Sequence, residues 1–300
     1  MRAIPYEHDH LLPLLDLVNG HLAAVVPGWA LTAEFLAEHL QRNVGEYVTD
    51  PWVVERATLC VLEGHRMLAA AHLLRYEEDP GVAAALRGVG EISWLVFLPD
   101  RADAATAVLS AVHGMLASWP VTRRQAYGSG LPKMPLAGIP DAWPHVARAL
   151  GATGYEPARK GNREALYGGR LDGIPTPDEP PVPGTTISRS VGRLGVRFSA
   201  LQGEEELGIC ECVADLGRGG ALPALRGWAD LSEVRVAEGW RNRGVGSWLV
   251  GTAAEWLRHG RCERVILVVD GEDEAAGRFY RRFGWEVLAR EVLPGSRRRA

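Results

Sequence analysis

The chain contains 300 residues, of which 47% are hydrophobic and 23% charged, so it has enough apolar material for the cores of two globular domains. Its net charge is −4, and the small basic excess beyond residue 184 is too weak for a nucleic-acid surface, although it suits a small polyanionic ligand. There is no apolar run of about 18 residues and no signal-peptide core, which predicts a cytoplasmic protein with neither a membrane nor a nucleic-acid partner.

Four cysteines, Cys60, Cys210, Cys212 and Cys262, are too few and too unevenly spaced for a disulfide framework. Cys210 and Cys212 are two residues apart, but no second Cys or His pair supplies the four ligands of a zinc site. We therefore expect reduced thiols and no metal.

The first half of the chain begins with a short strand, after which apolar spacing predicts two helices at 9–22 and 32–40, with Asp9 and Thr32 as N-caps. A hairpin at 56–62 and 66–74, a buried strand at 90–98 and a helix at 102–119 are predicted next. The half closes with a strand at 123–127, a helix at 143–150 and a hairpin of 154–160 with 164–170.

A proline-rich segment, Ile174–Gly184, holds five prolines in eleven residues and separates the two halves. Proline excludes regular helix and central strand, and such a run favours an extended spacer. The predicted domains are therefore residues 1–174 and 184–300, joined by a linker at 175–183.

The second half begins with a predicted hairpin at 196–201 and 206–213, followed by a strand at 231–236, a loop at 237–243 and a helix at 244–259. A strand at 265–269, a helix at 273–283 and a strand at 285–292 complete it, and Ser296–Arg299 are expected to form a solvated tail. The orders of elements in the two halves overlay, which predicts a tandem of one α/β architecture with mixed sheets. The second copy lacks the paired helices of the first.

A glycine-opened helix follows the strand Leu231–Val236 and carries the main chemical signal. Gly244 and Gly246 lack Cβ atoms, so a diphosphate can approach the backbone N–H groups at the positive end of the helix. Arg241 and Arg243 can neutralise its charge. The stretch from Val234 to Gly246 is thus predicted to bind a polyanionic ligand.

These residues resemble the GCN5-related N-acetyltransferase (GNAT) superfamily. Its Arg/Gln-x-x-Gly-x-Gly/Ala signature is matched by Arg241, Gly244 and Gly246. A second family motif, near the C-terminus, is matched at Ala276, Tyr280 and Gly284 and substituted at two positions, by Asp273 for Asn and Trp285 for Phe. The resemblance implies acetyl-CoA as co-substrate, a mixed sheet whose fourth and fifth strands splay apart, and transfer of an acetyl group to an amine.

The same resemblance implies roles for individual residues. Glu233 is the expected general base, with Asp230 as the alternative, and Tyr280 is the expected acid for the leaving thiolate. The residues expected to contact acetyl-CoA are Val234, Val236, Arg241, Asn242, Arg243, Gly244, Val245, Gly246, Ser247 and Asp273. A carboxylate at Asp273 puts negative charge beside an anionic ligand.

The first half carries no glycine pair at the equivalent of this loop, Phe97–Thr106, where Asp100 and Asp103 would occupy the space of a diphosphate. We therefore interpret residues 1–174 as a degenerate GNAT-like copy that binds no coenzyme.

Three function classes remain open at this level. The leading one is an N-acetyltransferase acting on a small-molecule or peptide amine, and the second is an acyl-CoA sensor without turnover. The third, another nucleotide binder, lacks both the acidic residue of a dinucleotide site and the Gly-Lys-Ser/Thr of a P-loop. The sequence identifies neither the acceptor amine nor the oligomeric state, and assembly as a homodimer stays open.

Overall fold

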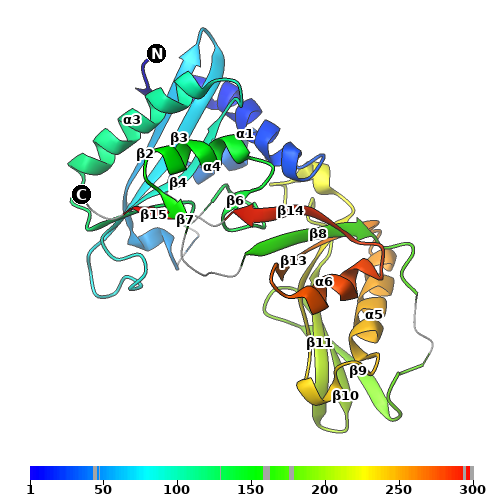
Figure 1. Cartoon of the computed structure of the whole chain (residues 1–300). Helices are drawn as coiled ribbons and strands as arrows, with labels where there is room; N and C mark the ends of the chain where they lie inside the picture. Colours follow the sequence, from blue (N-terminus) through cyan, green and yellow to red (C-terminus); the bar gives the residue numbers. More distant parts are fainter. Residues whose placement is uncertain are drawn as a thin grey trace. The chain divides into compact units, whose positions relative to one another are not determined.

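The computed structural model describes residues 1–42, 46, 48–128, 130–157, 163–175, 179–292 and 295–297. The chain forms two compact units: unit 1 comprises residues 1–164 and 289–300, and unit 2 comprises residues 165–288. Helices accompany a mixed sheet in each unit (Figure 1), so the predicted fold class of two α/β domains is confirmed.

Unit 1 is built on a seven-stranded sheet in the order β1-β2-β3-β4-β5-β15-β7. Its strands are β1 (Ile4–Pro5), β2 (Val53–Glu63), β3 (Arg66–Tyr76), β4 (Val89–Phe97), β5 (Arg123–Ala126), β7 (Glu156–Pro157) and β15 (Gly295–Arg297). Its helices are η1 (His8–His10), α1 (Leu11–Val25), α2 (Ala33–His39), η2 (Asp50–Trp52), α3 (Ala102–Ser118) and α4 (Pro144–Ala152). Strand β4 pairs antiparallel with β3 and parallel with β5.

Unit 2 is built on the second sheet, ordered β6-β14-β8-β13-β12-β11-β10-β9. Its strands are β8 (Glu164–Arg170), β9 (Thr185–Val191), β10 (Val196–Gln202), β11 (Glu205–Val213), β12 (Trp228–Val236), β13 (Arg264–Asp270) and β14 (Glu286–Val292). The end of β14 lies in unit 1, where it pairs with β6 (Ile139–Pro140). The helices are η3 (Pro223–Leu225), η4 (Glu238–Trp240), α5 (Val245–His259) and α6 (Glu274–Arg281).

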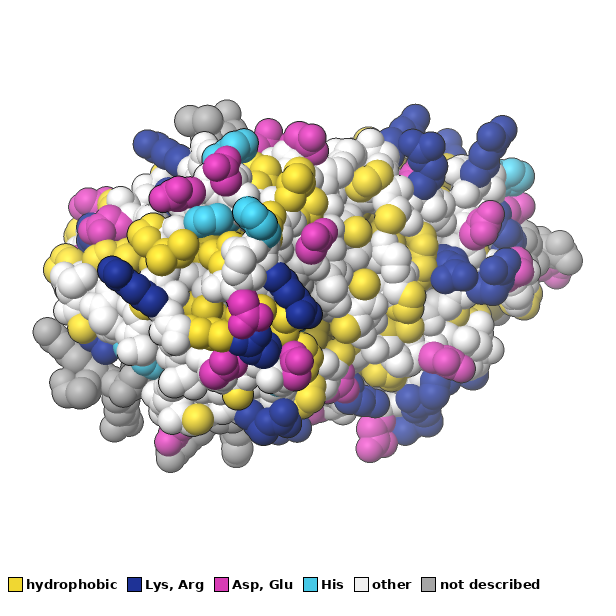
Figure 2. Space-filling view, turned by 90° about the horizontal axis from the view of Figure 1, so that it is seen from above, with side chains coloured by type: hydrophobic (Ala, Val, Ile, Leu, Met, Phe, Trp, Pro, Cys, Tyr) yellow, Lys and Arg dark blue, Asp and Glu magenta, His cyan; other side chains and the backbone are white. Residues whose placement is uncertain are grey.

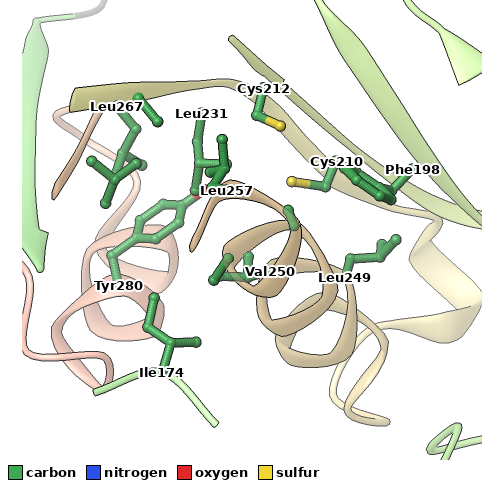
Figure 3. Packing of buried hydrophobic residues seen from close by; sticks show 14 of the residues in the cluster. Ile174, Phe198, Cys210, Cys212, Leu231, Leu249, Val250, Leu257, Leu267 and Tyr280 are labelled. Carbon is green, nitrogen blue, oxygen red and sulfur yellow. The ribbon is translucent and has the colours of Figure 1, made fainter. Parts of the chain in front are cut away.

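One core of buried residues joins this sheet to α5 and α6. Leu249 and Leu257 of α5, Leu231 of β12, Leu267 of β13 and Tyr280 of α6 belong to it (Figure 3). The predicted amphipathic spacing of the helix at 244–259 is confirmed, because its apolar stripe is the face that is buried.

Both sheets contain strands from the other half of the sequence: β15 in the first sheet, and β6 and β8 in the second. The predicted hairpin of 154–160 with 164–170 is wrong, because β7 belongs to the first sheet and β8 lies between β13 and β14 in the second; residues 158–162 lie outside the described part of the chain. The C-terminal β15, expected to be a solvated tail, pairs with β5 and β7. The units consequently divide between Glu164 and Ala165, not within 175–183.

Two glycines explain why β8 fits beside β14. A Cβ atom on Gly169 would lie 2.2 Å from Trp285 Cδ1, and one on Gly168 would lie 2.5 Å from Leu288 Cδ1. Trp285 Nε1 also donates a hydrogen bond to the carbonyl of Arg170 at 3.0 Å. The tryptophan that replaces the motif's phenylalanine therefore packs on the backbone of a strand without side chains at these positions.

None of the helices in the described ranges is long and apolar enough to cross a membrane.

Candidate functional site

Strands β12 and β13 separate part of the way along their length. They pair in parallel only at Trp228–Arg264, Ala229–Val265 and Asp230–Ile266, although β12 continues to Val236 and β13 to Asp270. Beyond Asp230 the two strands diverge, as the resemblance to the GNAT superfamily implied for its fourth and fifth strands.

The pairing with β11 determines which backbone groups of β12 point away from β11. The N–H of Ala237 donates to the carbonyl of Leu207 at 2.9 Å, which makes Gly208 and Val236 a non-hydrogen-bonded pair of the antiparallel ladder. The N–H and C=O of Val236, and of Val234 two residues earlier, therefore point away from β11 into the gap. The Val236 carbonyl accepts a hydrogen bond from Arg241 Nε at 3.2 Å there. This edge can accept an extended ligand as an added strand.

The loop after β12 presents backbone N–H groups at the start of α5. Asn242 and Gly244 both have positive φ angles, 61° and 85°, and Gly244 is the N-cap residue of the helix. Residues with positive φ that alternate with residues of negative φ turn their successive N–H groups to the same side of the loop, where these groups can bind an anion. A Cβ atom at Gly246 would lie 3.4 Å from both Val236 Cγ2 and Phe279 Cζ, so the glycine keeps this space open.

The gap, the loop and α6 enclose a cavity of about 610 Å³. Nine residues predicted from the sequence line it: Val234, Val236, Arg241, Asn242, Gly244, Gly246, Ser247, Asp273 and Tyr280. The cavity is thus made largely of the residues that the sequence motifs identified.

Three predicted residues are not among those that line the cavity. Val245 is buried in the core, and the Arg243 guanidinium stacks on Trp240, 5.1 Å from the ring centroid. Glu233 lies on the opposite face of β12 from Val234, is 43% exposed, and forms an ion pair with Arg235 at 3.4 Å. Sequence spacing placed these residues in the right segment but could not specify their directions.

Tyr280 projects from α6 into the core, toward Leu231 and Leu257 (Figure 3). Its ring stacks on Trp285 with centroids 5.7 Å apart. Burial, with smaller effects from Cys210 and Asp273, raises the pKa of Tyr280 above its usual value. The hydroxyl is therefore protonated at neutral pH and able to donate a proton.

Asp273 is the N-cap residue of α6. Its Oδ1 accepts a hydrogen bond from the N–H of Ala276 at 2.9 Å. A carboxylate at a helix N-terminus is stabilised by the helix dipole, which gives the substitution in the family motif a structural reason.

Asp230 occupies the branch point where β12 leaves β13. A register shift between β11 and β12 shows that β12 has one extra residue between Asp230 and Glu233, a bulge that leaves both carboxylates on the same face of the sheet. Burial raises the pKa of Asp230, although the Ser232 hydroxyl, donating at 2.9 Å, opposes the shift.

Sequence analysis missed Arg282, which lines the cavity from the end of α6. Its guanidinium lies 5.3 Å from the ring centroid of Phe279, and its Nη2 donates to Ser247 Oγ at 3.4 Å. The sequence shows two arginines, Arg281 and Arg282, directly after the matched tyrosine. It does not indicate which of the two faces the cavity and which faces the solvent.

Unit 1 repeats this strand geometry but fills the gap. Strands β4 and β5 pair only as far as Ile92–Ala126, and the Leu98 N–H donates to the Leu68 carbonyl as Ala237 does to Leu207. Leu95 is accordingly the equivalent of Val234. The Tyr127 hydroxyl accepts a hydrogen bond from the Leu95 N–H at 3.1 Å and donates one to the Leu95 carbonyl.

The branch-point carboxylate is also repeated in unit 1. Glu91 pairs with Leu74 as Asp230 pairs with Val213, and one extra residue, Ser93, follows it on β4. Glu91 is fully buried and accepts a hydrogen bond from Gln125 Nε2 at 3.0 Å. Unit 1 therefore contains the same branch-point bulge, with the carboxylate of Glu91 hydrogen-bonded inside the protein.

Acidic and basic side chains are interspersed on the face of the molecule drawn in Figure 2. Within the described residues, no three His, Cys, Asp or Glu side chains are grouped so that they could hold a metal ion.

In comparison with known proteins, residues 195–285 match the model of the acetyltransferase (GNAT) family. A tandem GNAT protein from the clavulanic acid biosynthesis pathway superposes with a TM-score of 0.62 at 14% identity, covering 98% of this chain and 97% of the other. A GCN5-related N-acetyltransferase from Sphaerobacter thermophilus gives 0.61 at 17% identity, covering 97% and 94%. No curated sequence matches significantly. At these identities the structural matches establish the fold alone.

Proposed function

We propose that the protein transfers an acetyl group from acetyl-CoA to a primary amine, on the premise that residues 195–285 match the acetyltransferase (GNAT) family and that the chain shares the fold of a tandem GNAT protein. The observation that carries this proposal is the gap beyond Asp230, where the backbone groups of Val234 and Val236 face the cavity. A pantetheine arm has amide groups that can pair with such an edge.

The cavity fits the other parts of acetyl-CoA as well. The N–H groups around Gly244 would bind the diphosphate, and the open space at Gly246 would allow it to approach the helix. Arg241 and Arg282 line the cavity and would offset phosphate charge. Acetyl-CoA would supply an acetyl thioester and a thiolate leaving group.

We assign the general base to Asp230 in preference to Glu233. Neither carboxylate is among the residues that line the cavity, and both lie on the same face of the sheet, so the choice between them depends on their surroundings. A base that takes a proton from an ammonium group works best with a pKa near the working pH, and burial raises the pKa of Asp230. Glu233 is more exposed, and its ion pair with Arg235 engages the charge that a base would use.

Tyr280 would act as the acid. It lines the cavity and carries an O–H that can be donated to the departing thiolate, and burial raises its pKa, which makes it a weaker acid than an exposed tyrosine. The ammonium group would give one proton to Asp230, and its nitrogen would then form a C–N bond to the thioester carbonyl carbon. As the C–S bond breaks, the thiolate would receive a proton from Tyr280, and the second proton on nitrogen would leave to solvent. The tyrosine would then recover its proton from solvent.

Unit 1 has no corresponding role in our proposal. Tyr127 holds the backbone groups of Leu95 that a pantetheine arm would need. Transfer is therefore assigned to unit 2 alone, and unit 1 is proposed to bind no coenzyme.

The proposal is tested by measuring thiol release from acetyl-CoA with a panel of aminoglycosides, polyamines, amino acids and peptides. The expected result is amine-dependent thiol release that is slower in the Tyr280→Phe protein and slowest in the Asp230→Asn protein. Calorimetric binding of acetyl-CoA without thiol release for any amine would instead identify an acyl-CoA sensor.

A further inference from the structure

Unit 2 has another cavity, of about 360 Å³, at the end of the sheet where β12 and β13 begin. The cavity assigned to acetyl-CoA takes Val234 and Val236 from the other end of β12, so the two cavities share no residue. Three arginines from separate segments line this second space: Arg226 before β12, Arg261 after α5 and Arg264 at the start of β13. It is called the arginine cavity below.

The guanidinium groups of these three arginines are not neutralised inside the protein. Within the ranges that the structure describes, the ion pairs of unit 2 involve other arginines. Arg264 lies over the ring of Trp228, 5.2 Å from the ring centroid, and this cation–π contact occupies none of its N–H donors. Three forked donors therefore meet at one cavity.

Two carboxylates, Asp215 and Glu263, also line the arginine cavity. Asp215 Oδ1 accepts a hydrogen bond from the N–H of Gly227 at 3.1 Å. Glu263 acts on a fourth arginine, since the ion pair with Asp172 and, to a smaller extent, Glu263 raise the pKa of Arg170. Both carboxylates thus have partners other than the three arginines, and the charge of the cavity favours an anion.

Arg261 has a backbone conformation that ordinarily belongs to glycine, with φ 62°. The Cys262 N–H donates to the Leu257 carbonyl and the Arg261 N–H to the Arg258 carbonyl, both at 2.9 Å, which ends α5 as a Schellman motif. The left-handed residue of that motif is usually glycine, yet Gly260 stands one residue earlier with φ −76°. A long basic side chain held in a strained conformation points to a function for that side chain.

Backbone contacts fix the three segments relative to one another. The Gly227 carbonyl accepts hydrogen bonds from the N–H groups of Glu263 at 2.8 Å and Arg264 at 3.3 Å. A Cβ atom on Gly217 would lie 2.5 Å from the backbone nitrogen of Arg226, so the preceding loop packs directly on that residue. The backbone that carries the arginines is therefore in place before a ligand arrives, which lowers the entropic cost of binding.

We infer that the arginine cavity binds a phosphate monoester of a small organic molecule. The terminal oxygens of a phosphate point in three directions and can accept from three guanidiniums on separate segments, whereas one guanidinium fork already matches both oxygens of a carboxylate. The volume equals that of about twelve water molecules at roughly 30 Å³ each, which leaves room for a sugar-sized group against Trp228. The binding uses neither acetyl-CoA nor the residues of its cavity, so it is independent of the transfer reaction proposed above.

Calorimetric titration of the full chain with ribose 5-phosphate, in the absence of acetyl-CoA, tests the inference. Arg226→Gln combined with Arg264→Gln removes two charged donors and is expected to raise the Kd by about tenfold or more. Arg218→Gln is the matched control, because Arg218 is exposed on the loop before Arg226 but does not line the cavity. Arg241→Gln, in the acetyl-CoA cavity, should also leave the Kd unchanged and so locates the bound phosphate.

Arg261→Gly is the sharpest variant, because binding and stability should respond in opposite directions. The Kd for ribose 5-phosphate should rise about fivefold, roughly the upper effect of one exposed ion pair. The thermal midpoint should stay the same or increase, because glycine adopts a φ of 62° without strain. A merely structural arginine would give a lower midpoint and an unchanged Kd.

Two further ligands define the chemistry. Ribose, which lacks the phosphate, should show no measurable binding, and succinate, a dicarboxylate, should bind more weakly than ribose 5-phosphate. Failure of ribose 5-phosphate to bind, equal binding of ribose or succinate, or an unchanged Kd in both the double variant and Arg261→Gly would overturn the inference. A rise in Kd in Arg241→Gln as large as that in the double variant would also overturn it, because the phosphate would then lie in the other cavity.

Discussion

The two diverging strand pairs, β12 with β13 in unit 2 and β4 with β5 in unit 1, have the same backbone pairing, but different groups occupy the gap between the strands. In unit 2 the backbone groups of Val234 face a cavity of about 610 Å³, whereas in unit 1 those of Leu95 are hydrogen-bonded by the Tyr127 hydroxyl. One side chain thus replaces what a bound ligand would supply. The comparison teaches that an internal hydroxyl can satisfy the backbone groups which diverging strands leave unpaired, so that the same strand arrangement is kept without a ligand.

The loops that follow these strands differ as well. In unit 2 the helix opens at Gly244, with exposed arginines beside it. In unit 1 the residue before α3 is Arg101, whose guanidinium is engaged by Asp103 at 3.1 Å and by Glu63 at 3.3 Å. The basic charge that could meet a phosphate is therefore neutralised in unit 1 and available in unit 2.

The largest expected effect concerns the branch-point carboxylates. Asp230→Asn should lower kcat by roughly 10²- to 10⁴-fold, because it removes the proton acceptor, whereas Glu233→Gln should change kcat less than about threefold. The wild-type rate should rise as pH increases through the raised pKa of Asp230, since only the ionised carboxylate accepts a proton. Steady-state pH profiles of the three proteins measure both effects, and a larger loss in Glu233→Gln would reverse the assignment.

Tyr280 should produce the next largest effect. Tyr280→Phe keeps the ring that stacks on Trp285 and removes only the acidic hydroxyl, so kcat should fall by about 10- to 100-fold while the Kd for acetyl-CoA stays the same. Stopped-flow thiol release and calorimetry separate the two quantities. Full activity in this variant would show that water, and not Tyr280, protonates the leaving thiolate.

Tyr127 tests the other side of the comparison. Tyr127→Phe leaves the N–H and C=O of Leu95 without their partner in a buried gap, which should lower the free energy of unfolding by about 1–3 kcal/mol. Urea unfolding followed by fluorescence measures the loss. The kcat of unit 2 should be unchanged, and a variant as stable as the wild type would show that the hydroxyl does not hold the gap.

Asp273 should give the smallest effect. Asn is as good an N-cap as Asp, so Asp273→Asn keeps the hydrogen bond to Ala276 while it removes a negative charge from the cavity. The KM for acetyl-CoA should fall by about two- to threefold, in line with the weak energy of an exposed charge pair. Asp273→Ala removes both the charge and the N-cap hydrogen bond, so its comparison with Asp273→Asn separates the two effects. A higher KM for acetyl-CoA in Asp273→Asn would contradict repulsion between the Asp273 carboxylate and the ligand.

The sequence predicted those parts of the fold that depend on local pattern. The strand, loop and glycine-opened helix from Leu231 to His259 were predicted because apolar periodicity and the two glycines report on neighbouring residues. The pairing of β8 with β13 and of β15 with β5 was not, because partners distant in sequence leave no periodic signal. Strand β9 was missed because it directly follows the proline-rich segment.

The candidate site shows the same limit. The motif located Val234, Gly244 and Tyr280, but it could not show that Arg243 turns to Trp240 or that Glu233 lies on the far face. Those directions depend on the bulge in β12 and on stacking partners outside the motif. Gly168 and Gly169, with Trp285, were the overlooked signal for the exchanged strand, because paired glycines next to a large aromatic ring indicate close backbone packing.

The central claim, that only unit 2 binds acetyl-CoA, is tested most directly by calorimetric titration of the full chain. The account predicts one site per chain and no measurable binding in Gly246→Leu, whose side chain would fill the space between Val236 and Phe279. Gly239→Ala is the control, because a Cβ atom there would meet nothing within 4 Å. Two sites in the wild type, or undiminished affinity in Gly246→Leu, would contradict the account.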